Sequence, residues 1–437
     1  MNLLYENFFG KIWKKFPSRK ELQQQLCILL LIFVVVPSAK AIGDEIADEN
    51  PVPLHVVIEG NHKTTEKAIL KETGLIVREA RIGTISGEEV RKRLLNTHLF
   101  SSVFVTVEES PSEIVVHIKV KERFTPVPIP IFYTQREETG GGIFLLEPNF
   151  LGTMKVLVLG TVISTRGEKY QLNYMDDNLL GTRWTVFFRV FYGENILRRY
   201  DVDEEIYAYF QAFTNIVLMV GYKITDHLIP SVGMAYRRQQ THKVDDYPPP
   251  PEDLLSHSFL LNIRYEATNY EDYYDRGFKM FLLIDQASPM LGSERTFTHV
   301  VTTCDYVYPI IEGVIFRLVG EWGDGDGDQD ILTYYRLGGN VGSRGLPVRG
   351  IWVPSYVFLS IGGEEPVFRH KWGVLTATQF ADFLFTKEDA PVRTYASGGV
   401  GIRIYLKKIA MPALGIDGAF SAFTGDFKLS AFLGKSF

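Results

Sequence analysis

Long stretches of two-residue alternation dominate the chain beyond Arg123. In one stretch the apolar set is Trp184, Val186, Phe188, Val190 and Tyr192, and in another it is Phe259, Leu261, Ile263 and Tyr265. Successive side chains of a strand point to opposite faces of a sheet, so each stretch has one apolar face and one face that accepts Arg, Asn or Glu. Apolar faces of this length match the roughly 9–11 residues that a tilted strand needs to cross a bilayer, whereas the strands of a β-sandwich are usually shorter.

No stretch after Ile42 approaches the ~20 consecutive apolar residues of a transmembrane helix. A mature chain that spans a membrane must therefore do so with strands closed into a barrel, because lipid offers no partner to unpaired backbone groups. Turn signals divide residues 126–437 into about sixteen strands, with short turns on one side and longer polar loops, such as 323–352, on the other. We predict a mainly β fold, in which a sixteen-stranded antiparallel transmembrane β-barrel over residues 126–437 follows one small α+β domain.

The first 41 residues have the order of a cleaved export signal. A basic segment precedes an apolar run from Leu26 to Val36, and Ala39-Lys40-Ala41 supplies a cleavage site that places the mature start at Ile42. The alternative is an uncleaved membrane anchor, although the run is too short for a spanning helix. The sequence therefore predicts residues 1–41 to be a signal peptide and the mature protein to lie outside the cytoplasm.

The charge and cysteine content of the mature chain exclude several kinds of partner and site. The signal holds six of the 46 Lys and Arg and two of the 52 Asp and Glu, so the mature chain has a formal net charge of −10. This balance argues against nucleic acid as a partner. Cys304 is then the only cysteine, so no internal disulfide is expected. Alternating aspartates at 324–330 fit a flexible acidic loop better than a calcium loop, and we expect neither a metal nor a cofactor.

Residues 52–123 have the pattern of a small α+β module. We expect strands at residues 54–58, 103–107 and 114–120, and helices at 64–74 and 86–96. Ser86 and Glu89 have the spacing of a capping box at the start of the second helix, and Gly74 is a stop signal for the first. One strand edge of a sheet with this order stays open and can bind an extended peptide by β-augmentation.

Three parts of this module resemble a polypeptide-transport-associated (POTRA) domain. They are Val57-x-x-Gly60-Asn61-x-x-Thr64, Leu94-Leu95…Leu99-Phe100-Ser101-x-Val103 and Ile118-x-Val120-Lys121-Glu122. The alternative is an unrelated α+β domain. The resemblance implies a periplasmic domain over residues 52–123, whose open strand edge binds unfolded outer-membrane protein clients.

A second set of motifs follows along the chain in the predicted barrel. It consists of Asn149-Phe150-Leu151-Gly152-Thr153, the loop Gly338-Gly339-Asn340-Val341-Gly342-Ser343-Arg344-Gly345-Leu346, Glu364, Phe380-Ala381-Asp382, Gly399-Val400-Gly401-Ile402-Arg403 and Asp417. In order and spacing the set resembles the BamA/TamA family of outer-membrane insertases and translocases. The resemblance covers essentially the whole mature chain. It implies a protein of the bacterial outer membrane, in contact with membrane lipid, with the N-terminal domain in the periplasm.

In that family a loop arginine, within a Val-Arg-Gly-aromatic motif, folds into the barrel and contacts acidic side chains of the wall. The resemblance assigns this role to Arg344 and Gly345, behind Gly338 and Gly339, and matches Asp382 and Glu364 to the wall acids. A guanidinium offers a planar fork of donors that carboxylates hold bidentately, which would fix a long loop inside the barrel. Ser343 and Leu346 depart from the motif, and Val348-Arg349-Gly350 is a second candidate. The alternative is that either arginine is an ordinary solvated loop residue without this role.

The chain ends on an alternating strand with Phe437, similar to the signal by which outer-membrane proteins are recognised for insertion. No motif of a hydrolase nucleophile, phosphate loop or zinc protease occurs, so an enzyme is the least favoured hypothesis. The resemblance implies insertion of β-barrel proteins into the outer membrane, or translocation of polypeptides across it. A passive channel or structural barrel that has lost this role is the alternative. Gly140 to Gly142 and the prolines at 126, 128 and 130 suit a weakly paired seam.

Overall fold

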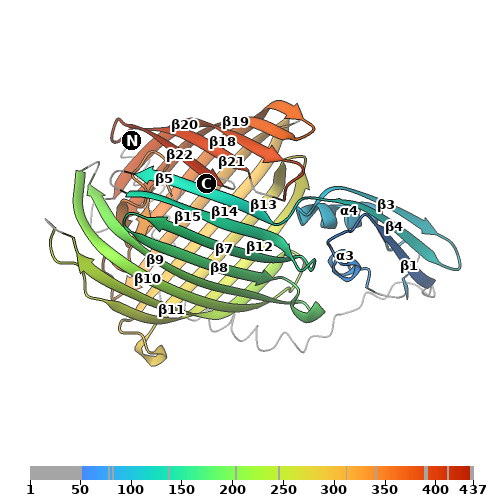
Figure 1. The fold of residues 1–437 in the computed structure, drawn as a ribbon, viewed down its shortest axis with the longest axis horizontal. Helices are drawn as coiled ribbons and strands as arrows, with labels where there is room; N and C mark the ends of the chain where they lie inside the picture. Colours follow the sequence, from blue (N-terminus) through green and yellow to red (C-terminus); the bar gives the residue numbers. More distant parts are fainter. Residues whose placement is uncertain are drawn as a thin grey trace. The chain divides into compact units, whose positions relative to one another are not determined.

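The computed structural model describes residues 52–433 apart from residues 77–78, 81–82, 136–137, 202–203, 245–246, 312, 340–341, 388–391 and 411–412. The predicted signal peptide and the terminal Phe437 lie outside the described residues. No helix within them is both long and apolar enough to cross a membrane. A sixteen-stranded sheet makes up most of this part of the chain, and a four-stranded sheet with two helices precedes it (Figure 1).

The sixteen-stranded sheet follows the order of the chain, with every neighbouring pair antiparallel. Its strands are β5 (Val127–Gln135), β6 (Glu138–Phe150), β7 (Lys155–Ser164), β8 (Gly167–Asp176), β9 (Trp184–Asp201), β10 (Glu204–Tyr222), β11 (Leu228–Lys243), β12 (Leu254–Glu271), β13 (Tyr274–Ala287), β14 (Phe297–Ile311), β15 (Val314–Gly327), β18 (Ser355–His370), β19 (Gly373–Lys387), β20 (Arg393–Leu406), β21 (Leu414–Ser421) and β22 (Phe427–Leu433). Two 3-10 turns, η2 (Leu179–Gly181) and η3 (Pro289–Leu291), lie in its connections. The predicted mainly β fold and the number of strands are confirmed.

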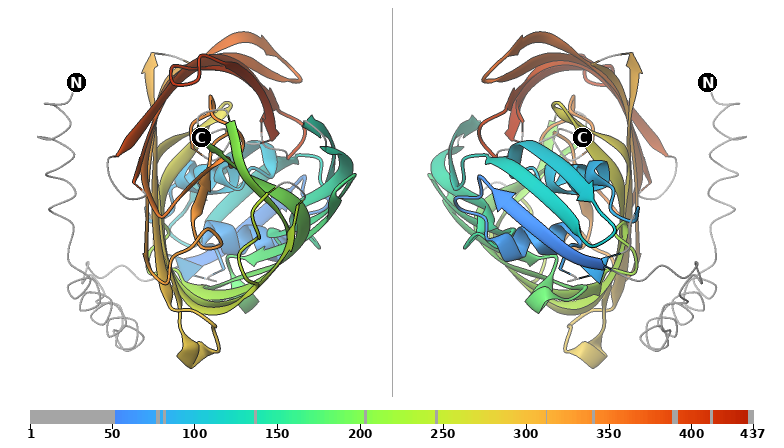
Figure 2. Two further views of the ribbon diagram at one scale, coloured as in Figure 1. Left: turned by 90° about the vertical axis from the view of Figure 1, so that its left-hand side faces the viewer. Right: turned by 90° about the vertical axis from the view of Figure 1, so that its right-hand side faces the viewer.

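The two end strands of this sheet, β5 and β22, are not paired with each other in the described residues, so the sheet curls around without closing (Figure 2). This differs from the closed barrel of the prediction. Pro128 and Pro130 lie in β5 and have no N–H to donate, so this edge lacks two of the donors that a closing strand would use. The described part of β22 is also only seven residues long.

The alternation of side chains assigns each strand residue to one of two faces. Ser360 of β18 stands directly opposite Asp382 of β19, and both contact the loop that folds into the curl of the sheet. Residues of this parity therefore form the inner face, which also carries the ion pairs Arg237–Asp285 and Arg317–Asp305. Ala381 and Phe383, on either side of Asp382, point to the outer face.

The N-terminal α+β region contains β1 (Val52–Glu59), α3 (Glu66–Thr73), β2 (Glu79–Ala80), α4 (Gly87–Asn96), β3 (Phe100–Glu109) and β4 (Ile114–Glu122), with the sheet order β2-β1-β4-β3. Its core is apolar and includes Ile69, Leu94 and Phe100, all fully buried. Ser86 caps α4 by accepting a hydrogen bond from the Glu89 amide at 3.3 Å. The carboxylate of Glu89 pairs with Arg93, however, so the second half of the predicted capping box is replaced by an ion pair along the helix.

Candidate functional site

A long connection between β15 and β18 brings the predicted loop motif to the inner face of the sheet. Within it a short ribbon of β16 (Tyr335–Leu337) and β17 (Ile351–Val353) holds residues 338–339 and 342–350 at its tip. Gly338 and Gly339 both have positive φ, of 114° and 67°. A Cβ at Gly338 would lie 2.1 Å from the carbonyl oxygen of Pro347, so only glycine fits where the two sides of the tip cross.

Arg344 is the centre of the site. Its Nε and Nη2 donate to the two carboxylate oxygens of Asp382 at 2.9 and 2.6 Å, and its backbone N–H donates to the same group at 3.1 Å. The Nη1 atom reaches Asp417 at 3.1 Å and Nη2 also reaches Ser360 at 3.0 Å. The guanidinium carbon lies 3.3 Å from the ring centroid of Phe380. We call Arg344, Asp382, Asp417 and Ser360 the loop lock, because they join the loop to β18, β19 and β21.

A second arginine completes the electrostatics of the loop lock. Arg403 of β20 donates to Asp417 at 2.7 and 3.2 Å, so two guanidiniums face two carboxylates and the formal charges cancel. Asp382 and Asp417 are fully buried and Arg344 is 5% exposed. Charges buried this deeply persist only when they are paired and hydrogen-bonded.

Glycines allow the loop and the wall to approach this closely. A Cβ at Gly345 would lie 2.6 Å from the Cβ of Ser397, and the Ser397 hydroxyl lies 2.7 Å from that of Ser343. On the wall, a Cβ at Gly401 would lie 1.9 Å from the carboxylate of Asp417. The glycine of the loop motif and the Gly-x-Gly of β20 thus leave room for the same ion cluster.

The structure brings together most, but not all, of the residues that the sequence assigned to this site. Glu364 does not contact Arg344; it accepts a hydrogen bond from Thr376 at 2.5 Å and another from Tyr405. The second wall acid beside Arg344 is Asp417. The reason is distance along the strand: Glu364 lies four residues beyond Ser360, or roughly 13 Å at the rise of a strand. The predicted pairing of Arg344 with Glu364 is therefore wrong.

Arg349, the second candidate for the motif arginine, occupies a different position. Its side chain is exposed, its φ is +51°, and its backbone carbonyl accepts a hydrogen bond from the Trp352 indole at 2.8 Å. Of the two arginines, only Arg344 is buried against wall carboxylates. In this structure Arg344 contacts the carboxylates of the wall, and Arg349 does not occupy that position.

The loop is also attached to the opposite wall, which the sequence did not indicate. Trp352 is 1% exposed and packs edge-on against Tyr209 of β10, with ring centroids 5.7 Å apart. Arg336 donates to the Tyr209 hydroxyl at 2.9 Å, and the Tyr200 amide donates to the Gly350 carbonyl at 2.9 Å. The loop thus spans the curl of the sheet from β9 and β10 to β18–β21. In the sequence, only the rarity of tryptophan in this chain could have indicated that Trp352 attaches the loop to β9 and β10.

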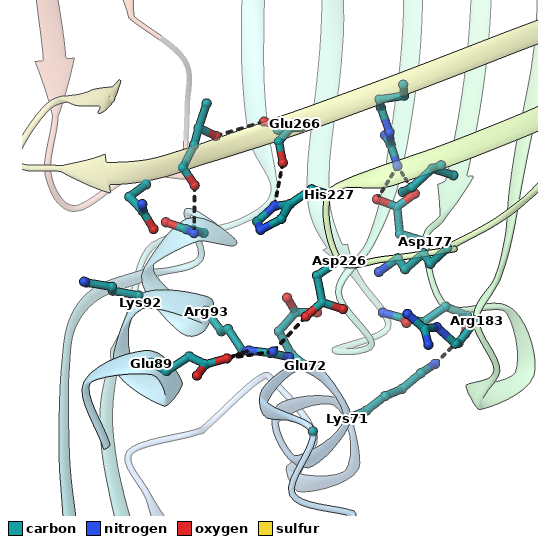
Figure 3. A pocket seen from close by; sticks show the side chains of 18 of the residues that line it. Lys71, Glu72, Glu89, Lys92, Arg93, Asp177, Arg183, Asp226, His227 and Glu266 are labelled. Atoms are coloured by element: carbon teal, nitrogen blue, oxygen red, sulfur yellow. Dashed lines mark hydrogen bonds and ion pairs between the residues drawn. The ribbon is translucent and has the colours of Figure 1, made fainter. Parts of the chain in front are cut away.

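A cleft of about 700 Å³ lies between the two helices of the α+β region and the nearby turns of the large sheet (Figure 3). Charged side chains line it from both sides: Lys71, Glu72, Glu89, Lys92, Arg93, Asp177, Arg183, Lys223, Asp226, Arg264, Glu266 and Asp275. Arg93 of α4 reaches Asp226 at 2.7 Å, and Lys71 donates to the Asn178 carbonyl (Figure 3). Asn96 exchanges two hydrogen bonds with the β12 backbone, at the Thr268 carbonyl and the Tyr270 amide.

Burial in this cleft shifts the titration of two α3 side chains. It raises the pKa of the Glu72 carboxyl and lowers the pKa of the Lys71 ammonium. Both shifts oppose charge, because a partly enclosed site solvates ions less well than water does. The cleft therefore favours a neutral Glu72.

The fold of this chain is similar to those of three solved outer-membrane proteins. The chain is similar in structure to BamA from Haemophilus ducreyi lacking POTRA domains 1–3, with 15% identity and a TM-score of 0.55 over 88% of this chain and 86% of that one. It is also similar to CdiB from Escherichia coli, with 11% identity and a TM-score of 0.62 over 87% and 74% of the two chains. For CdiB from Acinetobacter baumannii the values are 11%, 0.61, 87% and 73%.

The sequence comparisons place the family on the large sheet. No curated protein matches the chain. The profile of the Omp85 superfamily domain matches residues 149–383, which run from the end of β6 into β19 and take in the loop with Arg344. This match covers more than half of the 437 residues, so the protein belongs to the Omp85 superfamily.

Proposed function

We propose that this protein resides in the bacterial outer membrane and assists the insertion of β-barrel proteins, or the translocation of polypeptides, without catalysing a reaction. The observation that carries the proposal is that, among the described residues, β5 and β22 are free edges of a sheet whose interior is held by the loop lock. A free edge presents unpaired N–H and C=O groups that template an incoming strand. An edge that opens within a rigid wall is what an insertase needs.

The α+β region supports the same proposal, because it offers a strand edge to which a client could bind. We propose that residues 52–123 form a POTRA-type periplasmic domain following a signal peptide of residues 1–41, with the transmembrane barrel beginning at 126. In its sheet, β3 is an edge strand, whereas the other edge carries the two-residue β2. Phe104 of β3 is 67% exposed. An extended client segment paired with β3 would gain backbone hydrogen bonds and an apolar contact.

Capture of a client at the β5 edge tests the proposal. Phe132 lies in β5 and is 83% exposed, and Leu218, on the outer parity of β10, is 50% exposed. With Cys304 replaced by Ser, Phe132→Cys should form a disulfide with a cysteine in the last strand of a β-barrel client during its insertion into vesicles. Leu218→Cys is the matched control and should capture little.

Two results would count against this function. Equal capture at both positions would remove the special role of the β5 edge. Ion conductance by the purified protein, together with no acceleration of client insertion, would favour the passive channel.

A further inference from the structure

Two neighbouring turns of the large sheet carry basic side chains at some distance from the loop lock. The turn after β18 holds Lys371 and Trp372, and the turn after β20 holds Lys407 and Lys408. A hydrogen bond from the Lys407 amide to the Trp372 carbonyl, at 3.0 Å, joins the two turns. The amide of Phe124, which follows the last strand of the α+β region, donates to the Lys408 carbonyl at 2.8 Å. These turns therefore lie at the end of the sheet to which the α+β region is attached.

Lys371, Trp372 and Lys408, which we call the turn patch, expose donors that have no protein partner. The Lys408 ammonium lies 4.4 Å from the ring centroid of Trp372. Trp372 is 56% exposed, and both lysines are exposed. Among the described residues, no acid pairs with Lys371 or Lys408, and no acceptor takes the indole N–H of Trp372. The turn patch therefore offers two cations and one N–H group to a ligand from outside.

The other charges at these turns do not neutralise the turn patch. Arg369 and Lys407 share one acid, Asp272, which lies 3.0 Å from the Lys407 ammonium. The outer face of β18 carries Glu365, but this residue pairs with β19 four positions from the start of that strand, a distance of roughly 13 Å. With four cations and one acid, the two turns together are basic.

The outer face of the sheet next to the turn patch is apolar. Leu375 has the outer parity of β19, because it lies seven residues from the inward-facing Asp382. Phe368 of β18 and Ile404 of β20 stand opposite Leu375 on its two sides, and they are 59% and 41% exposed. A row of apolar side chains that ends in tryptophan and lysine is typical of the boundary between the acyl chains and the headgroups of a bilayer.

We propose that the turn patch binds the phosphate of an anionic phospholipid, in the leaflet on the side of the α+β region. This rests on the proposed location in the outer membrane and assigns a class of lipid to one site. The two ammonium groups attract the phosphate, the Trp372 indole donates to it, and the acyl chains lie against the apolar row. That row favours a lipid over a soluble anion. A choline headgroup fits less well, because its own cation is repelled by Lys371 and Lys408.

Quenching of Trp372 fluorescence by brominated lipids tests the proposal on the full chain in vesicles. Trp13→Phe, Trp184→Phe and Trp322→Phe leave two of the five tryptophans, of which Trp352 is 1% exposed and Trp372 is the reporter. Vesicles of phosphatidylcholine contain a small fraction of brominated phosphatidylglycerol or, in a parallel series, of brominated phosphatidylcholine. At equal mole fraction, phosphatidylglycerol should quench Trp372 more strongly.

Substitutions at the turn patch separate a local site from the charge of the whole protein. Lys371→Gln and Lys408→Gln should each lower the preference for phosphatidylglycerol about fivefold, the effect of one basic side chain near an anionic surface. Lys408→Arg keeps both the charge and the contact with the indole, so it should keep the preference. Arg238→Gln is the matched control, because it removes one exposed cation from the outer face of β11, ten residues from the start of that strand.

Each outcome bears on the proposal in a different way. All the substituted cations are exposed, so the variants should fold like the parent, as heat-modifiable gel mobility can check. Equal quenching by the two lipids overturns the proposed site but leaves the proposed location in a membrane intact. No quenching by either lipid would mean that Trp372 does not meet a bilayer, which also counts against that location. A preference that persists unchanged in both glutamine variants overturns the assignment to the turn patch.

Discussion

At the scale of residues, Arg344 shows which part of a buried site a sequence reveals. The alternation in β19 places Asp382 on the inner face, and the family resemblance, with the short spacing behind Gly338 and Gly339, favours Arg344 over Arg349. The acid that completes the site could not be chosen in the same way. Glu364 and Asp417 both have inward parity, and which of them the loop reaches depends on the depth to which it folds. That depth is set by contacts on the far wall, around Trp352, that local patterns do not encode.

The loop lock predicts strong coupling between its two main partners. Arg344→Ala and Asp382→Ala should each lower stability by about 3–5 kcal/mol, because each leaves a buried charge without its partner. The double variant should be little worse than either single variant, since both changes remove one shared interaction. Protease cleavage between residues 328 and 354, measured on the folded protein, follows the release of the loop. Arg349→Ala, at an exposed side chain, is the control and should leave the loop protected. Additive effects of the two single changes would contradict a direct pair.

At the scale of elements, the sequence predicted the strands well and their assembly less well. Two-residue alternation depends only on local geometry, so the strands of the large sheet could be predicted from the sequence. The helix caps at Ser86 and Gly74 are also local signals and were predicted as well. The ribbon of β16 and β17 was not predicted, because each strand has only three residues and is stabilised by packing inside the curl. That β5 and β22 are unpaired in the described part of the chain depends on two strands at opposite ends of the sheet order, which no local pattern relates.

The assignment of faces can be tested on two adjacent residues of the same kind. Thr302 and Thr303 of β14 point to the outer and inner faces, and Thr303 donates to Glu321 at 3.2 Å. In a membrane, Thr302→Arg should cost about 2–4 kcal/mol near the bilayer midplane. Thr303→Arg should cost much less, because it places a cation beside a carboxylate. Heat-modifiable gel mobility of the two variants after refolding measures the difference. A lower folded yield for Thr303→Arg would reverse the assignment of the faces.

At the scale of the whole molecule, the α+β region meets the large sheet both through buried contacts, such as the Asn149–Thr64 hydrogen bond at 2.9 Å and Ala410 in the apolar core of the α+β region, and through polar, partly exposed contacts around the cleft. The Arg93–Asp226 pair has side chains 34% and 57% exposed, so solvent screens it and it contributes at most about 1 kcal/mol. The two hydrogen bonds of Asn96 add directional contacts. Contacts of this kind join residues more than a hundred positions apart, and no local pattern predicts them. The partly exposed contacts around the cleft are the part of this interface that a change of pH can weaken.

Glu72 gives this interface a direction of pH dependence. Burial raises the pKa of its carboxyl, Asp177 and Asp226 add to the shift, and Lys223 and Arg93 oppose it. A carboxyl whose pKa is higher in the docked form than in the free form binds its proton more tightly when docked. Its contribution to docking is therefore fully present below the ordinary carboxyl pKa of about 4.3, and it is lost as the pH rises through the raised value.

Spin labels at Ser112→Cys in the α+β region and Leu180→Cys on the large sheet, with Cys304 replaced by Ser, should report this loss. Leu180 is 92% exposed and Ser112 lies in the turn between β3 and β4, so neither label disturbs packing. The distance distribution between the labels should broaden as the pH is raised from below the ordinary carboxyl pKa of about 4.3 through the raised pKa of Glu72. Glu72→Gln mimics the neutral carboxyl and should keep the distribution narrow throughout, whereas Glu66→Gln, at an exposed position of the same helix, should behave like the parent protein. A distribution that broadens equally in Glu72→Gln would assign the pH dependence to another group. A distribution that narrows on raising the pH would mean that the docked form holds Glu72 as an anion.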